Sequence, residues 1–460
     1  MTDALIAAGG TSAERLLVLA ALAAPTDAER AQLRDLACGE MDWVEVLHLA
    51  RRNATVPLVQ HRLTAEGLFD RVPLAGAFQA VSDEIATANE RRLVGAKELL
   101  RRFDAAGIRC VVLKGMLFAS EVYGDAYYKR MNDIDILLDI EQIDAAVEIY
   151  RDLGMFSVSE LLGKEPRVRE RRSHHLPSFV SRDGALVVGT HWGLITPLAP
   201  YTIDYAAIWK RVRPIDFHGV PAWAMAHEDN LHHLCVHLPY YKTGVRELAD
   251  IWNLVRYAGD DLDYGLVREA VTAAGSHNLV YHALSLTQRL VPDERIAALV
   301  AWTRPHTDRF YRYDVDRKTR DIHTLLRSRS THTATIEKAY LEFNATQALG
   351  EKVTRFAALW RNLLLVPGDE AARMSSLRTD NPLSRAGARA AAPYRLTRVF
   401  QRDLGRWLFP AALAKTVADL GVSAARTVRG STGDTVDLAA FAARVGMTPE
   451  QLRAVADSQE

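Results

Sequence analysis

The chain has 460 residues, of which 48% are hydrophobic and 25% are charged, a composition typical of a globular protein with room for two to four packed units. Basic and acidic residues number 57 each, so no overall charge attracts nucleic acid or an anionic membrane surface. Three widely spaced cysteines, Cys38, Cys110 and Cys235, provide neither a disulfide framework nor a metal-ligand cluster. We expect three buried thiols in the reducing cytoplasm.

The first 106 residues predict one helix after another. Residues 16–24 are apolar but too few to span a membrane, and no basic leader precedes them. We therefore expect a core helix with Thr11 or Ser12 near its N-cap. Farther along, four apolar residues recur at helical spacing before Gly107, namely Leu93, Ala96, Leu100 and Phe103. This pattern predicts an N-terminal helical region over residues 1–106.

A short strand and a tight turn follow. Val111, Val112 and Leu113 form an apolar, β-branched run that is too short for a helix, and it ends at Lys114-Gly115. A helix is expected over residues 116–123. Its first backbone N–H groups, those of Gly115 and Met116, can bind an anion, because the helix dipole favours negative charge there.

The segment from Asp133 to Leu138 alternates acidic and aliphatic residues. The two-residue period of a strand places Asp133 and Asp135 on one face, and Ile134 and Ile136 on the other. Neighbouring carboxylates repel and raise each other's pKa unless a cation lies between them. The pattern therefore predicts a metal site, and Mg²⁺ is the expected ion.

A strand ending in a glycine turn, a short helix and a second strand carrying Asp-x-Asp resemble the polymerase-β-like nucleotidyltransferase superfamily. More narrowly, Leu113-Lys114-Gly115 followed by Arg-Met-Asn-Asp-Ile-Asp-Ile-Leu from Arg130 resembles a bacterial family of uncharacterised nucleotidyltransferases, whose members carry Leu-Lys-Gly where better-studied relatives carry Gly-Ser. The resemblance implies transfer of a nucleoside monophosphate from an NTP to an acceptor, with release of pyrophosphate.

The resemblance also implies roles for particular residues. Asp133 and Asp135 would hold one or two Mg²⁺ ions. The N–H groups of Gly115 and Met116, with the side chains of Lys114 and Arg130, would contact the phosphates; pairing of Lys114 with a carboxylate is the alternative. The acceptor stays open between a small molecule, a protein side chain and an RNA end, although the balanced charge argues against nucleic acid. No membrane partner is expected.

Residues 174–194 predict a hairpin, because β-rich runs flank Arg182-Asp183-Gly184. The resemblance places a third catalytic carboxylate two residues before the His191-Trp192 pair, and that position is Gly189. Four outcomes stay open: His191 substitutes, an acid such as Glu247 or Asp250 reaches in, the protein binds nucleotide without turning it over, or the hairpin aligns differently. His174 and His175 are expected near the same face, and Trp192 in the core.

The remaining chain predicts a helical domain over residues 216–366 and an Arg-rich helical region over residues 367–460, with a connector at residues 377–391. His233 and His237 are four residues apart and can bind zinc, but no third ligand accompanies them. The fold class expected is α+β, with a small mixed sheet at residues 107–215 in a mainly helical protein. Besides the enzyme, two alternatives stay open: a nucleotide-binding scaffold and a histidine-based metal-dependent hydrolase.

Overall fold

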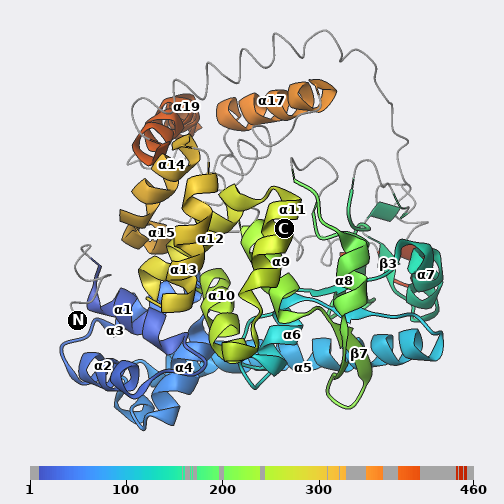
Figure 1. Ribbon diagram of the computed structural model, residues 1–460, viewed down its shortest axis with the longest axis horizontal. Coiled ribbons are helices and arrows are strands. Elements are labelled where there is room, and N and C mark those ends of the chain that lie inside the picture. Colours follow the sequence, from blue (N-terminus) through green and yellow to red (C-terminus); the bar gives the residue numbers. More distant parts are fainter. Residues whose placement is uncertain are drawn as a thin grey trace.

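The computed structural model describes residues 10–157, 159–160, 166, 168, 173–195, 201–238, 244–307, 309–320, 322–327, 349–365, 382–404, 442–443, 445–448 and 450–452. Helices dominate these residues, and the strands form a mixed seven-stranded sheet (Figure 1). The predicted α+β class is confirmed.

Five helices precede the sheet: α1 (Ser12–Ala20), α2 (Asp27–Cys38), α3 (Trp43–Arg52), α4 (Val56–Ala65) and α5 (Ala75–Ala105). Thr11 caps α1 as predicted, and its side chain accepts a hydrogen bond from the Glu14 N–H at 3.2 Å. Gly107 follows α5 with a φ of 69°, a left-handed conformation that favours glycine. Cys110 and Cys235 are buried, but Cys38 is exposed because it is the last residue of α2. The prediction of three buried thiols was wrong for Cys38.

The sheet has the strand order β3-β4-β5-β2-β1-β7-β6. Its strands are β1 (Val111–Val112), β2 (Ile134–Leu137), β3 (Phe156–Ser157), β4 (Phe179–Val180), β5 (Val187–His191), β6 (Arg213–Asp216) and β7 (Pro221–Ala224). β2 runs parallel to β5 and antiparallel to β1, and β4 and β5 form the predicted hairpin. The three central strands therefore come from three segments far apart in sequence.

The two faces of β2 have different surroundings, as the alternation predicted. Ile134 and Ile136 are buried in the main hydrophobic core, while Leu137 packs in a smaller cluster with Val111 and Leu113. Asp135 projects on the same side as Leu137 because side chains alternate along a strand. The burial of one face fixes the register of β2, and with it the direction of the Asp135 carboxylate.

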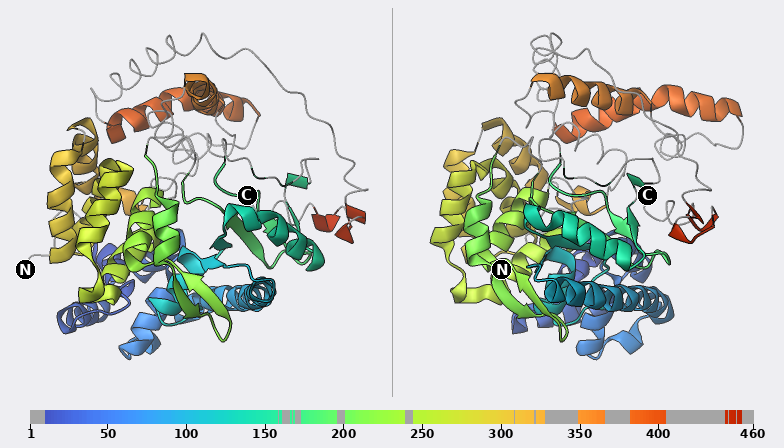
Figure 2. Two further views of the ribbon diagram at one scale, coloured as in Figure 1. Left: turned by 45° about the vertical axis from the view of Figure 1, so that its right-hand side comes forward. Right: turned by 90° about the vertical axis from the view of Figure 1, so that its right-hand side faces the viewer.

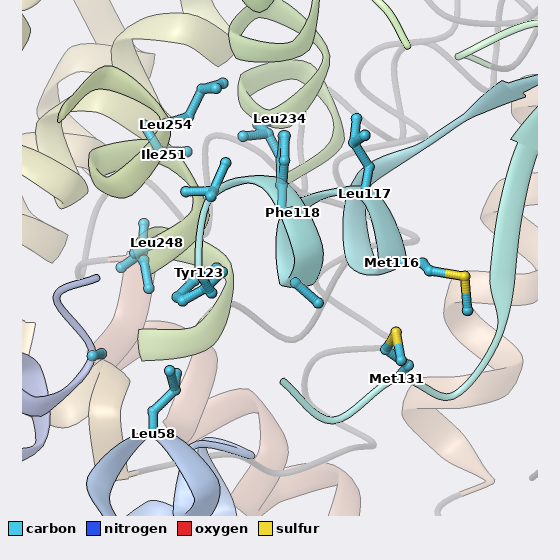
Figure 3. Close-up of a cluster of buried hydrophobic side chains, with 14 of the residues drawn as sticks. Leu58, Met116, Leu117, Phe118, Tyr123, Met131, Leu234, Leu248, Ile251 and Leu254 are labelled. Carbon is cyan, nitrogen blue, oxygen red and sulfur yellow. The ribbon is translucent and has the colours of Figure 1, made fainter. Parts of the chain in front are cut away.

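Helix α6 (Lys114–Glu121) follows β1 and begins two residues earlier than expected. Figure 3 shows its side chains Met116, Leu117 and Phe118 in a buried cluster, together with residues of α9 (His227–His237) and α10 (Val245–Ala258). The buried face of α6 therefore packs this helix against α9 and α10.

Helix α7 (Ile143–Asp152) ends before Gly154, which has a φ of 71°.

The remaining helices are α8 (Tyr205–Arg211), α11 (Tyr264–Ala274), α12 (His277–Leu290), α13 (Glu294–Thr303), α14 (Arg309–Arg320), α15 (Ile322–Arg327), α17 (Leu349–Leu364) and α19 (Pro382–Leu404), with short 3-10 turns at Phe69–Arg71, Ile140–Gln142, Gly259–Asp261 and Arg304–His306. In Figures 1 and 2, α17 and α19 lie at the end of the molecule away from α5. No helix in the described part of the chain is long and apolar enough to cross a membrane.

The structure differs from the sequence-based expectation in two places. The connector expected at residues 377–391 was wrong from residue 382 onward, because α19 begins at Pro382 and its alanines and arginines favour a helix; residues 377–381 lie outside the described residues. The sheet also continues through β7 to Ala224, beyond the expected core at residues 107–215. The division into four regions stays a prediction.

Candidate functional site

The sheet brings together the end of β1 and the middle of β2 and β5. The Leu113 N–H donates to the Asp135 carbonyl oxygen at 2.9 Å, and Asp135 lies opposite Gly189 in the parallel pair of β2 and β5. Lys114 follows Leu113 directly and His191 is the last residue of β5. Three chain segments therefore place their side chains around one carboxylate.

Both oxygens of Asp135 have a partner. Lys114 Nζ lies 2.9 Å from Oδ2, and His191 Nε2 lies 3.1 Å from Oδ1. Burial alone would raise the pKa of Asp135, but the Lys114 ammonium and the His191 hydrogen bond outweigh burial and hold this pKa well below its ordinary value. Asp135 is therefore an ionised carboxylate, which can only accept hydrogen bonds. It follows that His191 donates through Nε2–H.

The other ring nitrogen of His191 is a buried acceptor. With the proton on Nε2, a neutral imidazole carries its lone pair on Nδ1. This Nδ1 is buried and has no hydrogen-bond partner among the residues that the structure describes. In an Asp-His pair of this kind the carboxylate fixes the tautomer, and the far nitrogen keeps the lone pair that can take a proton.

Lys114 adopts an unusual backbone conformation to reach Asp135. Its φ is 31°, in the left-handed region that residues with a side chain seldom adopt, and the residue is only 9% exposed. Its Nζ also lies 3.1 Å from His237 Nε2. Because an ammonium only donates, His237 accepts through Nε2, and burial together with the Lys114 charge lowers the pKa of His237. Two groups thus fix the ammonium.

Asp133 stands just before β2 and has a different environment from Asp135. Its side chain is exposed to solvent, but nearby protein removes part of its hydration and, with the negative charge of Asp135, raises its pKa to about 6. The charges of Lys114 and His191 oppose this rise. An accessible carboxylate in a negative field, beside an ionised one, is a favourable place for a cation.

Gly189 leaves the space that Asp135 uses. A Cβ at this position would lie 2.5 Å from Asp135 Oδ1 and 3.4 Å from His191 Nε2. Real Cβ atoms essentially never approach another atom within 3.0 Å, so the hydrogen bond between Asp135 and His191 depends on the missing side chain. Where the resemblance expects a third acid, this chain has an Asp-His contact.

The two distant acids have partners of their own. Asp250 accepts from the Tyr123 hydroxyl at 3.0 Å and forms a buried ion pair with Lys129. Glu247 pairs with Arg246 at 2.7 Å. In the described part of the chain, no group of three or more His, Cys, Asp or Glu residues is arranged to hold a metal ion. No contact therefore supports a third acid from α10, nor a zinc site at His233 and His237, whose rings meet edge to face at 5.2 Å.

Comparison with known proteins identifies the family of the chain. A sequence model of the family described as "Uncharacterised nucleotidyltransferase" matches residues 39–292, more than half of the chain. The chain belongs to this nucleotidyltransferase family. Its members act in nucleotidyl transfer, and nucleotidyltransferases generally use divalent metal ions. No curated protein and no solved structure matched the chain.

The glycine turn of the nucleotidyltransferase faces this site with backbone donors. Gly115 and Met116 are the second and third residues of α6, and no side chain caps the N-terminus of that helix. Nothing lies within 4 Å of the position where Gly115 would carry a Cβ. The side of Gly115 where a Cβ would point is therefore open, and the helix N-terminus has N–H groups without a side-chain cap. Arg130 is exposed nearby in sequence, with Nε 3.4 Å from Asn132 Oδ1.

Sequence reasoning missed Arg92 of α5. Asn89, one turn earlier, donates to the Ala126 and Lys129 carbonyl oxygens at 2.9 and 2.7 Å, which fixes this face of α5 beside the segment leading to β2. Arg92 is half-buried, its Nε has no hydrogen-bond partner among the described residues, and burial and the charge of Arg130 lower its pKa while Asp133 raises it. A polar Asn within the apolar stripe of α5 was the available signal.

The histidines of the hairpin segment lie where they were expected. The rings of His174 and His175 are centred 5.5 and 5.3 Å from that of His191, and His175 pairs with His191 in an isolated bridge. Burial and the neighbouring His191 lower the pKa of His174 to about 3, so its ring is neutral. Trp192 packs against the main core, as predicted. The site thus combines carboxylates, one ammonium and neutral imidazoles.

Proposed function

We propose that this protein transfers a nucleoside monophosphate from an NTP to an acceptor and releases pyrophosphate, with Mg²⁺ as its divalent ion. The observation that carries the proposal is the pair Asp133 and Asp135, placed by β2 next to the uncapped N-terminus of α6. Membership of the nucleotidyltransferase family supports the class of reaction. Binding and activity assays would identify the NTP and the acceptor, which is a small molecule or a protein.

The residues present fit a hard divalent ion. Asp133 offers an oxygen ligand whose pKa is raised by partial burial and by the charge of Asp135, and a cation would relieve both effects. Asp135 keeps lone pairs on both oxygens beyond those used by Lys114 and His191. When bound, Mg²⁺ would neutralise charge on the phosphate oxygens as the α-phosphorus is attacked.

The phosphates would lie against the start of α6. The N–H groups of Gly115 and Met116 point along a helix N-terminus, where the dipole favours an anion. Arg130 and Arg92 would add two guanidinium groups on the side of Asp133, where Arg92 lacks a hydrogen-bond partner for Nε among the described residues. A direct phosphate contact by Lys114 stays a prediction, because Nζ already contacts Asp135 and His237.

His191 would act as the general base. Its Nδ1 takes the proton of the acceptor hydroxyl as that oxygen bonds to the α-phosphorus and the bond to pyrophosphate breaks. Asp135, which accepts from Nε2–H, would stabilise the resulting imidazolium. This role replaces the proton-accepting task of the third carboxylate, whose position is Gly189.

Calorimetric titration tests the proposal in its first step. The purified chain is titrated with Mg·ATP, Mg·GTP, Mg·CTP and Mg·UTP, and then assayed for pyrophosphate with candidate acceptors. We expect binding of at least one NTP that requires Mg²⁺ and is lost in Asp133→Ala. Asp104→Ala, on the exposed end of α5, should bind as the wild type does. Absence of binding by all four NTPs would contradict the proposal.

A nucleotide-binding scaffold is the second candidate, and Gly189 is the observation that favours it. Mg²⁺-dependent NTP binding that never yields pyrophosphate, with any acceptor tested, would support this alternative. For location, we propose the cytoplasm, since Cys38, Cys110 and Cys235 are all free thiols.

A further inference from the structure

The charges around Asp135 do not match a site for two divalent ions. Asp133 and Asp135 supply two negative charges, and the Lys114 ammonium removes one of them at 2.9 Å from Asp135 Oδ2. Burial and the Lys114 charge keep His237 neutral. The remaining net charge of about −1 suits one divalent ion, whereas a site for two such ions needs more carboxylate ligands.

The structure fixes Lys114 in place as part of the site. Its side chain is 11% exposed, and Nζ is held between Asp135 Oδ2 and His237 Nε2. The backbone accepts a φ of 31° at this residue, a conformation that costs a side-chain-bearing residue energy. Backbone strain of this kind persists where the surrounding structure stabilises it, and here it places the Lys114 ammonium next to the Asp135 carboxylate.

The adjacent position excludes a third carboxylate. A Cβ on Gly189 would meet Asp135 Oδ1 at 2.5 Å, so the existing position of Asp135 requires glycine. The chain has no carboxylate at Gly189, where the resemblance expects one. It also carries a positive charge at Lys114, where better-studied relatives carry Gly-Ser. Compared with those relatives, the site is more positive by two charges, which is the charge of one divalent ion.

We propose that the Lys114 ammonium permanently takes the place of one metal ion, so that this site works with a single divalent ion held by Asp133 and the open lone pairs of Asp135. The inference rests on the proposed function and deepens it. Like charge at Lys114 disfavours a second ion next to Asp135. Lys114 is thereby a residue that sets the number of metal ions.

Counting bound Mn²⁺ by electron paramagnetic resonance tests the inference. The wild type is titrated without nucleotide and again with a saturating non-hydrolysable NTP analogue, and we expect one ion per chain in each case. Lys114→Met removes the charge and keeps an unbranched side chain of similar length. We expect this variant to bind Mn²⁺ at least tenfold more tightly and to take a second ion with the analogue.

Two control variants test whether the charge of Lys114 causes the change in Mn²⁺ binding. Lys210→Met, on the exposed side of α8, should leave both the number of ions and the affinity unchanged. Lys114→Arg keeps the charge and should stay at one ion. The wild-type count needs no variant, so it decides the matter even where Lys114→Met does not fold.

The outcomes separate this inference from the proposed function. Two Mn²⁺ ions per wild-type chain, or equal Mn²⁺ affinity in Lys114→Met and the wild type, would overturn the inference while leaving nucleotidyl transfer intact. A protein that binds no NTP, yet binds one Mn²⁺ that tightens in Lys114→Met, would overturn the proposed function and support the role of Lys114.

Discussion

Replacing Gly189 by alanine is a direct perturbation of the Asp135–His191 contact. The new Cβ would lie 2.5 Å from Asp135 Oδ1, inside the 3.0 Å limit of real contacts, so the carboxylate must move by about half an ångström or more. Lys114 and His191 hold the two oxygens of Asp135 at 2.9 and 3.1 Å. The oxygen that the new Cβ displaces is Oδ1, which accepts the hydrogen bond from His191, so we expect this bond to break.

The size of the effect follows from the bond that is lost. A hydrogen bond to a charged group contributes about 1.5–3 kcal/mol, and each 1.36 kcal/mol is tenfold in rate. We expect kcat/KM for pyrophosphate release to fall by about 10- to 150-fold in Gly189→Ala. Gly76→Ala is the matched control, since no atom lies within 4 Å of its Cβ position in α5.

Two results would refute this reasoning. Full activity in Gly189→Ala would show that the Asp135–His191 contact has no part in the reaction. Higher activity in Gly189→Asp would show that the position is a vacant third-acid site, which a carboxylate can still fill. Thermal unfolding of each variant, followed by circular dichroism, separates loss of activity from loss of the fold.

Further predictions concern charge and stability. Burial and the charge of Asp135 raise the pKa of Asp133 from 3.8 to about 6, so stability is lost as the pH rises between these values and the cost persists above them. Asp133→Asn should therefore raise the metal-free unfolding temperature at pH 7.5 and abolish Mn²⁺ binding. An unchanged unfolding temperature would contradict this. For the same reason, wild-type Mn²⁺ affinity should rise between pH 5 and pH 7, and a flat calorimetric profile would exclude Asp133 as a ligand. Arg92→Met should weaken NTP binding about tenfold, because one guanidinium contact is worth about 1.5 kcal/mol, and should leave Mn²⁺ binding unchanged. Calorimetric titration measures both affinities, and equal NTP affinity in variant and wild type would exclude Arg92 from the site. Asp250→Ala leaves Lys129 as an unpaired buried charge, so the free energy of unfolding measured with urea should fall by about 3–5 kcal/mol. A fall below about 1 kcal/mol would show that water reaches Lys129.

The local parts of the site were predictable from sequence. Alternation around Asp133 and Asp135 gave the two faces of β2, and the apolar run before Lys114 gave β1 and the turn. The Asp-Gly pair gave the β4–β5 hairpin, which brought His191 to the correct face. These features depend on short-range periods and turn chemistry, which the sequence carries directly.

The long-range contacts were not predictable. Lys114 and His237 are 123 residues apart, and no local pattern indicates that α9 would point its last turn at the start of α6. Arg92 likewise reaches the site only because Asn89 fixes the rotation of α5 against the segment before β2. Such contacts follow from how helices pack on the sheet, which a single sequence leaves undetermined.

The most direct test is a crystal structure with Mn²⁺ and a non-hydrolysable analogue of whichever NTP binds, with the metal located by its anomalous signal. Our account predicts one metal peak bridging Asp133 and Asp135, and phosphate oxygens within hydrogen-bond reach of the Gly115 and Met116 N–H groups. A metal peak away from both carboxylates, or a triphosphate bound elsewhere on the protein, would contradict it.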